Sequence, residues 1–479
     1  MQFNSWTFLI VFLPVVIVTY FGLNKYYNRK CATWCLILSN LVFYGYGGLE
    51  CVLYLIACAI INFVVGKRLL RFHEKGLLII GLVFNLGSLG VLKYYNFFID
   101  SINALVKSDF NLLNLFLPMG LSFFTFQFIA LIYDCYKGNI ATLSFGNYMV
   151  FATYFPKIIQ GPIMLYQDFE KQYIPETNKC FNTENFAKGL YSLTLGFGKK
   201  ILIADKLALF VNPGFATNYV TYNSSMSILL MLAYTLQIYF DFSAYSDMAR
   251  GISFMFNIEL PRNFDSPYKA LSVNSFWKRW HMSLTAFFTR YLYIPLGGNR
   301  KGEWRTYLNI LIVFALSGLW HGANYTFIVW GLLHGIASVV ERKWNFPSKL
   351  HPVLQWGYTF LFTNVTWLFF RSGTLTQALQ IIKNIARFDF SGVVLGDLSN
   401  IISPEILYLL EQMKIDAFFR IFPILFILML LFSVLRFKNT DEQIIQFKPT
   451  VLKVAFTIVI MSWCILSFGT KITFIYEMF

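Results

Sequence analysis

Apolar residues are grouped along this chain in long runs that short charged stretches separate. Five runs of roughly 16 to 22 residues lie before residue 135, close to the ~20 residues with which an α-helix crosses a bilayer. They cover residues 6–23, 31–46, 51–66, 77–95 and 112–133. The pattern predicts five membrane-spanning helices in this part of the chain.

Lysine and arginine residues flank these runs unevenly. They are concentrated at residues 24–30 and 67–75, whereas the turn at 47–50 has none. Because basic loops stay on the cytoplasmic side, both basic loops are predicted to be cytoplasmic and the N-terminus to lie outside. The first run has no basic stretch before it, so we expect it to be kept as a helix and not cleaved as a signal peptide.

The segment 145–175 is apolar but interrupted. Pro156, Gly161 and Pro162 fall in its middle. Such breaks remove backbone hydrogen bonds that lipid cannot replace, so they occur where protein covers the backbone or where it lines a wet cavity. The sequence predicts a re-entrant or kinked element that forms a wall of a substrate path.

The remaining apolar runs predict further helices. They cover residues 186–211, 226–242, 307–340 (two helices), 353–370, 420–435 and 451–470, with a mixed segment at 371–419. We therefore predict an all-α polytopic membrane protein with about eleven transmembrane helices, plus re-entrant and interfacial helices around a central channel. It would form one domain over residues 1–479, with a motif-bearing core at about 90–340 and C-terminal helices at 353–479.

Residues 259–306 are the least hydrophobic part of the core. Basic residues are interleaved there with Trp and Phe, and they include Lys278, Arg279, Arg290 and Arg300. A basic, aromatic, amphipathic stretch is typical of a helix that lies at the membrane interface. The same residues would also suit a phosphate-binding vestibule, and the two interpretations are compatible.

Composition supports the assignment as a membrane protein and argues against a nucleic-acid-binding protein. The chain is 57% apolar and 13% charged, against roughly 25% charged residues in soluble domains. The net charge of +15 is explained by basic cytoplasmic loops, so no nucleic-acid partner is expected. Seven scattered cysteines without a Cys-x-x-Cys pair support neither a disulfide framework nor a metal site.

Three of the five histidines, His281, His321 and His334, fall between residues 281 and 334. His321 follows Trp320 in the stretch Ser-Gly-Leu-Trp-His-Gly-Ala-Asn, with apolar runs on both sides. Ionisable groups at membrane depth are costly and by default mark a functional site. Asp241 and Asp247, at the end of the 226–242 run, would support that site or balance nearby basic residues, whereas His334 is expected to be structural.

Several motifs resemble one family. Trp277–Ser283, Tyr293–Asn299 and Gly318–Gly331 are similar to stretches of the membrane-bound O-acyltransferase superfamily. The likeness is closest to its bacterial branch that acetylates cell-surface polysaccharides such as alginate and peptidoglycan, with D-alanyl-transferring relatives. Tyr154–Ile163 and Tyr239–Asp247 also look like that branch, so the resemblance spans about residues 90 to 340.

The resemblance implies roles for particular residues. His321 matches the catalytic histidine of the family, and His281 matches a second histidine of the bacterial branch. Some members end in a Phe-Ile-Tyr motif whose tyrosine is proposed to relay the acyl group, which makes Tyr476 the candidate here. This chain continues with Glu477 and Met478, where the motif usually continues with an aromatic residue.

The resemblance also implies an activity and its partners. The donor would be cytoplasmic acetyl-CoA, used as a substrate with no permanently bound cofactor. Lys278, Arg279, Arg290 and Arg300 would bind its phosphates, and Asn324 would polarise the thioester carbonyl. The acceptor would be a cell-surface polysaccharide, reached through a periplasmic or extracellular SGNH-type transferase, with this protein in the bacterial inner membrane.

Alternatives stay open at this level. His321 can act as a general base toward the acceptor hydroxyl or as a nucleophile that takes the acetyl group itself. A transporter or flippase for a polysaccharide or a lipid-linked sugar would also use broken helices and charged membrane residues. A membrane scaffold for a periplasmic enzyme is a third hypothesis.

Overall fold

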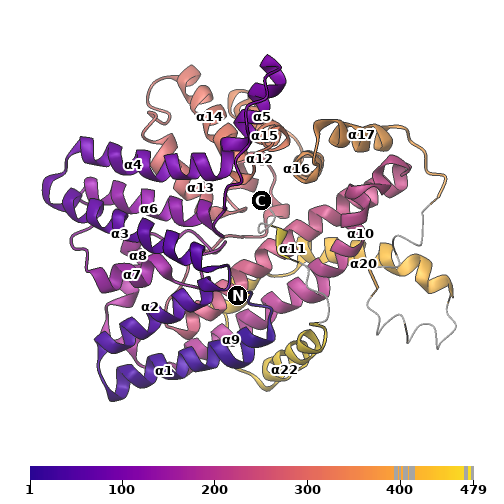
Figure 1. Cartoon of the computed structure of the whole chain (residues 1–479). Coiled ribbons are helices and arrows are strands. Elements are labelled where there is room, and N and C mark those ends of the chain that lie inside the picture. The colour runs from indigo at the N-terminus through magenta and orange to yellow at the C-terminus, as the bar shows by residue number, and fades with distance from the viewer. Residues whose placement is uncertain (393–397, 399–400, 403–407, 409–415, 469–472, 476–479) are drawn as a thin grey trace. The chain divides into compact units, whose positions relative to one another are not determined.

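The regular secondary structure of the computed structural model is helical (Figure 1). It describes residues 1–392, 398, 401–402, 408, 416–468 and 473–475. Over these residues the only β-feature is an isolated antiparallel bridge between Phe264 and Trp280. The predicted all-α class is confirmed.

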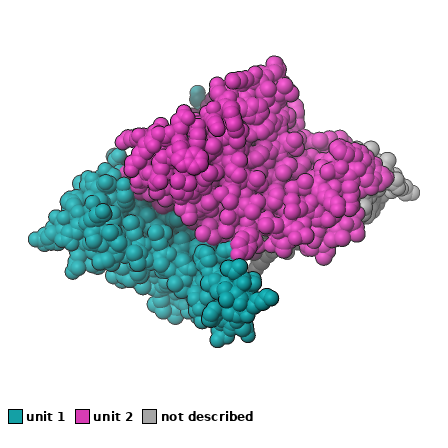
Figure 2. Space-filling view, turned by 90° about the horizontal axis from the view of Figure 1, so that it is seen from above, with its two compact units in different colours: residues 1–195, 245–262, 447–468 teal, residues 196–244, 263–446, 469–479 magenta. Residues whose placement is uncertain are grey.

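The chain divides into two compact units, coloured separately in Figure 2. Unit 1 holds residues 1–195, 245–262 and 447–468, and unit 2 holds residues 196–244, 263–446 and 469–479. The long helix α11 (Ser224–Met255) contributes residues to both. His281, His321 and His334 all belong to unit 2, and the single domain predicted over 1–479 stays a prediction.

Unit 1 contains the N-terminal helices and one helix from near the C-terminus. These are α1 (Leu13–Tyr26), α2 (Arg29–Gly45), α3 (Leu49–Phe72), α4 (Lys75–Leu89), α5 (Tyr95–Val106), α6 (Leu121–Tyr136), α7 (Phe145–Thr153), α8 (Tyr166–Tyr173), α9 (Thr183–Phe197) and α22 (Val451–Leu466), with π-helical turns η1 (Thr7–Phe12) and η2 (Gly90–Tyr94) and the 3₁₀ turn η3 (Glu176–Lys179). The apolar runs predicted before residue 96 correspond to helices.

Several helices are suited to a bilayer. Four helical stretches among the described residues are long and apolar enough to cross a membrane: Thr7–Tyr26, Leu49–Phe72, Lys75–Val106 and Ser224–Met255. Three shorter apolar helices occur at Leu121–Tyr136, Phe422–Arg436 and Val451–Leu466. The chain is thus a multi-pass membrane protein, while the predicted number of about eleven spans is not confirmed.

Several helix boundaries differ from the predicted runs, and two of them are informative. The run at 112–133 becomes helical only at Leu121, because Gly120 adopts a left-handed conformation (φ +72°), and an added Cβ there would lie 2.4 Å from the carbonyl oxygen of Ile158. The run at 226–242 does not end there, since α11 continues to Met255. Its later polar residues are buried inside the protein, so polarity does not terminate the helix.

The helical interruption predicted within residues 145–175 is confirmed. Helix α7 ends at Thr153, α8 begins at Tyr166, and the backbone between them is not helical. One freed backbone group is satisfied within unit 1, because the Phe155 N–H donates to Asn40 Oδ1 at 3.2 Å. Protein thus covers the interruption, as the absence of water in lipid requires. The predicted substrate path along it stays a prediction.

Helices α3 and α4 are joined by two buried amides. Asn62 Nδ2 donates to Asn85 Oδ1 at 3.1 Å, and Asn85 Nδ2 donates to Asn62 Oδ1 at 2.7 Å. Each amide also donates to the carbonyl four residues earlier in its own helix. The pair therefore satisfies its own polar atoms inside an apolar interface.

We expect Asn62→Leu to lower the free energy of unfolding by about 1 kcal/mol, because interhelical hydrogen bonds in membrane proteins contribute about that much. The double variant Asn62→Leu/Asn85→Leu should lose less than the sum of the two single variants, since no amide is left unpaired. Reversible unfolding in detergent measures both values. Additive losses would show that the two amides do not act as a pair.

Unit 2 contains the helices that carry the histidines. These are α10 (Asp205–Ala216), α12 (Val273–Trp277), α13 (Met282–Phe288), α14 (Glu303–His321), α15 (Tyr325–Trp344), α16 (Pro352–Arg371), α17 (Leu375–Ala386), α20 (Asp416–Arg436) and α21 (Thr440–Ile445), with π-helical turns η4 (Gly198–Ala204) and η7 (Thr289–Tyr293) and 3₁₀ turns η5 (Asn218–Val220) and η6 (Pro267–Lys269). The basic segment 259–306 is therefore a series of short helices and loops. A single continuous helix is not observed over this segment, and its place at the membrane interface stays a prediction.

Helices α14 and α15 cross with their backbones in contact. A Cβ atom added to Gly331 would lie 2.3 Å from the carbonyl oxygen of Phe314, and one added to Gly318 would lie 2.3 Å from that of Phe327. Glycine at these two positions allows the backbones of α14 and α15 to approach closely. This approach fixes the end of α14, where His321 lies.

Candidate active site

His321 is the last residue of α14, and its side chain is buried. Three aromatic rings surround the imidazole edge to face: Trp320 at 4.9 Å, Trp330 at 5.1 Å and Phe370 at 5.2 Å between centroids. The backbone turns sharply after it into the extended residue Gly322. Helix end and rings together hold the imidazole in one orientation.

His281 lies in the loop immediately before α13, in a left-handed conformation with φ +45°. Backbone pairing causes this geometry, because the Met282 N–H donates to the Asn263 carbonyl at 3.0 Å and the Asp265 N–H donates to the Arg279 carbonyl at 2.9 Å. Non-glycine residues held in this region are often found at functional sites. Complete burial lowers the pKa of His281 to about 3, so its imidazole is neutral near pH 7.

Trp320 connects the two histidines. Its ring lies 4.9 Å from that of His321 and 6.1 Å from that of His281, and Phe242 contacts His281 at 4.7 Å. Unit 2 therefore places both predicted histidines against one indole. A buried imidazole can take a proton from a hydroxyl or attack a carbonyl carbon.

His334 has a different environment. Trp277 Nε1 donates to its Nδ1 at 3.1 Å, and its Nε2 lies 3.0 Å from Thr366 Oγ1. Because the Trp N–H only donates, Nδ1 is the acceptor and Nε2 carries the proton. Both ring nitrogens are thus used to join three elements, which accounts for His334 as a structural residue.

A cavity of about 360 Å³ opens beside α14 in unit 2. Its lining is mostly apolar and aromatic, with polar groups from Lys278, Thr285, Thr289 and Ser317. Ser317 lies four residues before His321, hence on the same side of the helix. The cavity therefore reaches to within one helical turn of the histidine.

Glu341, which sequence reasoning missed, holds the loop that leads to His281. Its carboxylate accepts from the backbone N–H of Val273 at 2.6 Å and of Asn274 at 2.9 Å, and from the Asn274 side chain at 2.8 Å. These are the unpaired N–H groups at the start of α12, where a negative charge is favourable. One carboxylate from α15 thereby fixes the position of Trp277.

We expect Glu341→Ala to reduce stability by about 1–3 kcal/mol, because one buried and one partly buried N–H group lose their acceptor. Acyl transfer should fall with it, since α12 precedes His281. Thermal unfolding and a transfer assay measure the two effects. Glu303→Ala, which removes an exposed carboxylate at the start of α14, is the matched control. Equal behaviour of the two variants would contradict the capping role.

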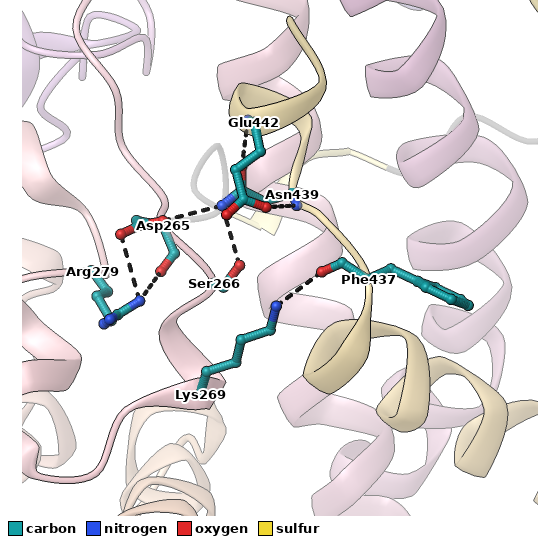
Figure 3. Close-up of polar contacts among 7 residues, drawn as sticks. All are labelled: Asp265, Ser266, Lys269, Arg279, Phe437, Asn439 and Glu442. Carbon is teal, nitrogen blue, oxygen red and sulfur yellow. Dashed lines mark hydrogen bonds and ion pairs between the residues drawn. The ribbon is translucent and has the colours of Figure 1, made fainter. Parts of the chain in front are cut away.

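The predicted phosphate-binding residues lie in different settings. Lys278 is exposed and lines the cavity, Arg300 is exposed, and Arg290 is half-buried beside the ring of Tyr291. Arg279 is partly engaged within the chain, because its Nη1 donates to the Asp265 carbonyl at 3.0 Å and lies 3.5 Å from the Asp265 carboxylate (Figure 3).

Figure 3 also shows how this loop is tied to the segment before α21. Asn439 Nδ2 donates to Asp265 Oδ1 at 3.2 Å and to Ser266 Oγ at 3.1 Å, and Lys269 Nζ donates to the Phe437 carbonyl at 2.9 Å. Residues 265–269 of this loop are therefore held by the segment 437–439 within unit 2.

The other predicted residues are distributed as follows. Asn324 caps α15, accepting from the Thr326 N–H at 3.0 Å and donating to the Gly373 carbonyl at 2.9 Å. Asp241 lies in unit 2 and pairs with the buried Lys200 at 2.7 Å, whereas Asp247 belongs to unit 1. Tyr476 lies outside the described residues.

Sequence reasoning missed Lys200, although a signal existed. It follows Lys199 inside the apolar run 186–211, and an ionisable residue in such a run is itself unusual.

Across the described ranges, no group of three or more His, Cys, Asp or Glu residues could hold a metal ion.

The helical architecture and the buried histidine pair define a multi-pass membrane protein with an imidazole site. Residues 115–377, which include both histidines, match the MBOAT, membrane-bound O-acyltransferase family. The chain belongs to this family and is an acyltransferase.

Several curated proteins are similar over much of their length. A peptidoglycan O-acetyltransferase from Helicobacter pylori is 38% identical over 435 residues, covering 83% of this chain and 81% of that protein. A probable alginate O-acetylase, AlgI, from Pseudomonas aeruginosa is 36% identical over 413 residues, covering 83% and 77%. A teichoic acid D-alanyltransferase from Bacillus subtilis is 29% identical over 261 residues, covering 51% and 64%. The recognition made from the motifs is confirmed.

Proposed function

We propose that this acyltransferase takes an acetyl group from cytoplasmic acetyl-CoA and passes it across the membrane, through a partner protein, to hydroxyls of a cell-surface polysaccharide. The observation that carries the proposal is the pair of buried imidazoles, His281 and His321, against the single ring of Trp320. The names of the similar proteins, an acetyltransferase of peptidoglycan and an acetylase of alginate, support the acetyl group and the acceptor class.

The main chemical requirement of acyl transfer is that the attacking hydroxyl loses its proton. Its oxygen attacks the thioester carbonyl carbon, its proton passes to an imidazole nitrogen of His321, and the carbon–sulfur bond breaks with the electron pair leaving on sulfur. A thiol with a pKa of about 8.5 is a good leaving group, so the base is the main requirement. The imidazolium then returns the proton to the thiolate. Alternatively, the imidazole itself takes the acetyl group before passing it on.

The cavity beside Ser317 is suited to the donor. Its apolar lining would receive the acyl-bearing arm of acetyl-CoA, with the thioester directed toward His321. Lys278 lines the same cavity and would bind a phosphate of the nucleotide part, with Arg290 and Arg300 farther along the same segment. Arg279 would have to give up part of its contact with Asp265 to take part.

Tyr476 would be the next carrier. In this proposal its phenol oxygen takes the acetyl group and its proton passes to His321, after which a nucleophile of an SGNH-type partner outside the cell accepts the group. The motif Phe-Ile-Tyr at residues 474–476 supports this role. Mass spectrometry of the C-terminal peptide after incubation with isotopically labelled acetyl-CoA would detect the adduct.

Deleting the gene tests the function as a whole. We expect the deletion strain to lose ester-linked acetate, released by mild alkali, from one envelope polysaccharide, and the wild-type gene to restore it. The polymer that loses acetate identifies the acceptor among peptidoglycan and exopolysaccharides. Unchanged acetate together with reduced export of polymer would contradict the proposal and favour a transporter or flippase.

A further inference from the structure

A buried cluster of charges lies in unit 2 where η4, α10 and α11 meet. Lys200 Nζ is 2.7 Å from Asp241 Oδ1 and 2.9 Å from Asp205 Oδ1. The side chain of Lys200 is 0% exposed, and those of Asp241 and Asp205 are 3% and 7% exposed. Charges this deep are expensive and need a complete set of partners.

The C-terminal segment supplies the remaining partners. Lys200 Nζ donates to the Thr473 carbonyl at 3.2 Å and lies 4.2 Å from the centre of the Phe474 ring. Asp241 Oδ2 accepts the Ile475 N–H at 2.8 Å. Phe474 and Ile475 are themselves buried. Lys200 therefore donates hydrogen bonds to Asp241 and to the Thr473 carbonyl and forms an ion pair with Asp205.

The cluster is close to the histidine site along α11. Asp241 precedes Phe242, whose ring contacts that of His281 at 4.7 Å between centroids. Tyr476, in turn, directly follows Ile475 in the sequence. One carboxylate therefore holds the backbone immediately before the tyrosine, and the next residue of its helix touches the imidazole.

We propose that Lys200 and Asp241 form a clamp that docks the C-terminal segment Thr473–Ile475 beside the histidine site and so positions the end of the chain for acyl transfer. The positioning role in acyl transfer rests on the proposed function, whereas the docking of residues 473–475 is independent of it. Lys200 and Asp241 are positioning residues. Asp205 is the second carboxylate paired with Lys200, at 2.9 Å, whereas the Ile475 N–H donates to Asp241, so Asp205 is the matched control.

Hydrogen–deuterium exchange of the detergent-purified full chain tests the docking. In Asp241→Ala, a C-terminal peptide that contains residues 473–475 should exchange about tenfold faster or more than in wild type, because its anchor is lost. The same peptide should keep near-wild-type exchange in Asp205→Ala. A peptide from α16 reports whether each variant is folded. Equal exchange in Asp241→Ala and wild type, or equal acceleration in both variants, would overturn the clamp.

A second pair of variants acts from the C-terminal side and leaves all three charges in place. Ile475→Pro removes the N–H that Asp241 accepts, whereas Ile475→Val keeps it. We expect Ile475→Pro to accelerate exchange of the peptide and to lower kcat for acetyl transfer by up to roughly 10²-fold at an unchanged KM for acetyl-CoA, as misplacement of a reacting group does. Ile475→Val should match wild type in both.

The readouts separate the two proposals. Rapid exchange in Ile475→Pro with wild-type kcat would refute the positioning role, and wild-type exchange in this variant would refute the docking. A third outcome would refute the proposed function and leave the docking unaffected. In that outcome, the wild-type protein transfers no acetyl group, but residues 473–475 are protected from exchange and lose that protection in Asp241→Ala.

Discussion

Replacing His321 with alanine should reduce acyl transfer by about 10²–10⁴-fold, the usual contribution of a positioned general base. The reason is local: no other imidazole lies at the end of α14, one turn from the cavity that Ser317 lines. Transfer is measured as ester-linked acetate on the envelope polysaccharide of cells that carry each variant. If His321 forms an acetyl-imidazole, the loss should be at least as large.

Folding must be separated from chemistry in this experiment. The imidazole packs against Trp320, Trp330 and Phe370, so its removal leaves a space among aromatic rings. Thermal unfolding and gel filtration of the purified variant show whether it still folds. His351→Ala, which removes an exposed histidine at the start of α16, is the control and should keep activity. A folded His321→Ala protein with wild-type transfer would remove the central residue of the mechanism.

Gly331→Ala should destabilise the protein by about 1–3 kcal/mol or more, although glycine to alanine usually favours a helix. The added Cβ would lie 2.3 Å from the Phe314 carbonyl oxygen and 3.2 Å from the Gly318 backbone. Neither neighbour is a flexible side chain, so α14 and α15 must move apart. Because α14 ends at His321, acyl transfer should fall as well. Denaturant or thermal unfolding in detergent gives the stability change.

Gly357→Ala provides the matched control for that substitution. Gly357 lies inside α16 of the same unit, and apart from its chain neighbours and the nearby backbone of its own helix, no atom lies within 4 Å of the position that a Cβ would take. The change there should leave stability unaltered or raise it by about 0.5–1 kcal/mol, through helix propensity alone. Equal effects at Gly331 and Gly357 would mean that the close approach of α14 and α15 does not contribute to stability.

Patterns of apolar residues predicted most of the helices because lipid leaves the backbone few alternatives. The helices near 353–370 and 451–470, the two helices around the Ser317–Asn324 stretch and the interruption after Thr153 all follow from run length, proline and glycine. The prediction went wrong where burial inside protein replaced contact with lipid. There α11 continues past Asp241 and Asp247 to Met255, because its polar side chains are enclosed.

Some features of the candidate site could be predicted from the sequence, and others could not. His321 could be found from sequence, because one titratable residue in an apolar run is conspicuous and its motif resembles a family. The contacts between residues far apart in sequence could not, since no local pattern encodes them. Glu341 reaches Val273 across 68 positions, and Asp241 reaches Ile475 across 234.

By itself, then, the sequence determined that this is a helical membrane protein, which family it belongs to and which histidine is central, because hydrophobic run length and motif chemistry are local properties. Only the tertiary structure decided that His281 and His321 meet at Trp320, that Arg279 is engaged by Asp265, and that Lys200 and Asp241 hold the end of the chain. Those outcomes depend on which buried polar groups find partners, and that is fixed when the helices pack.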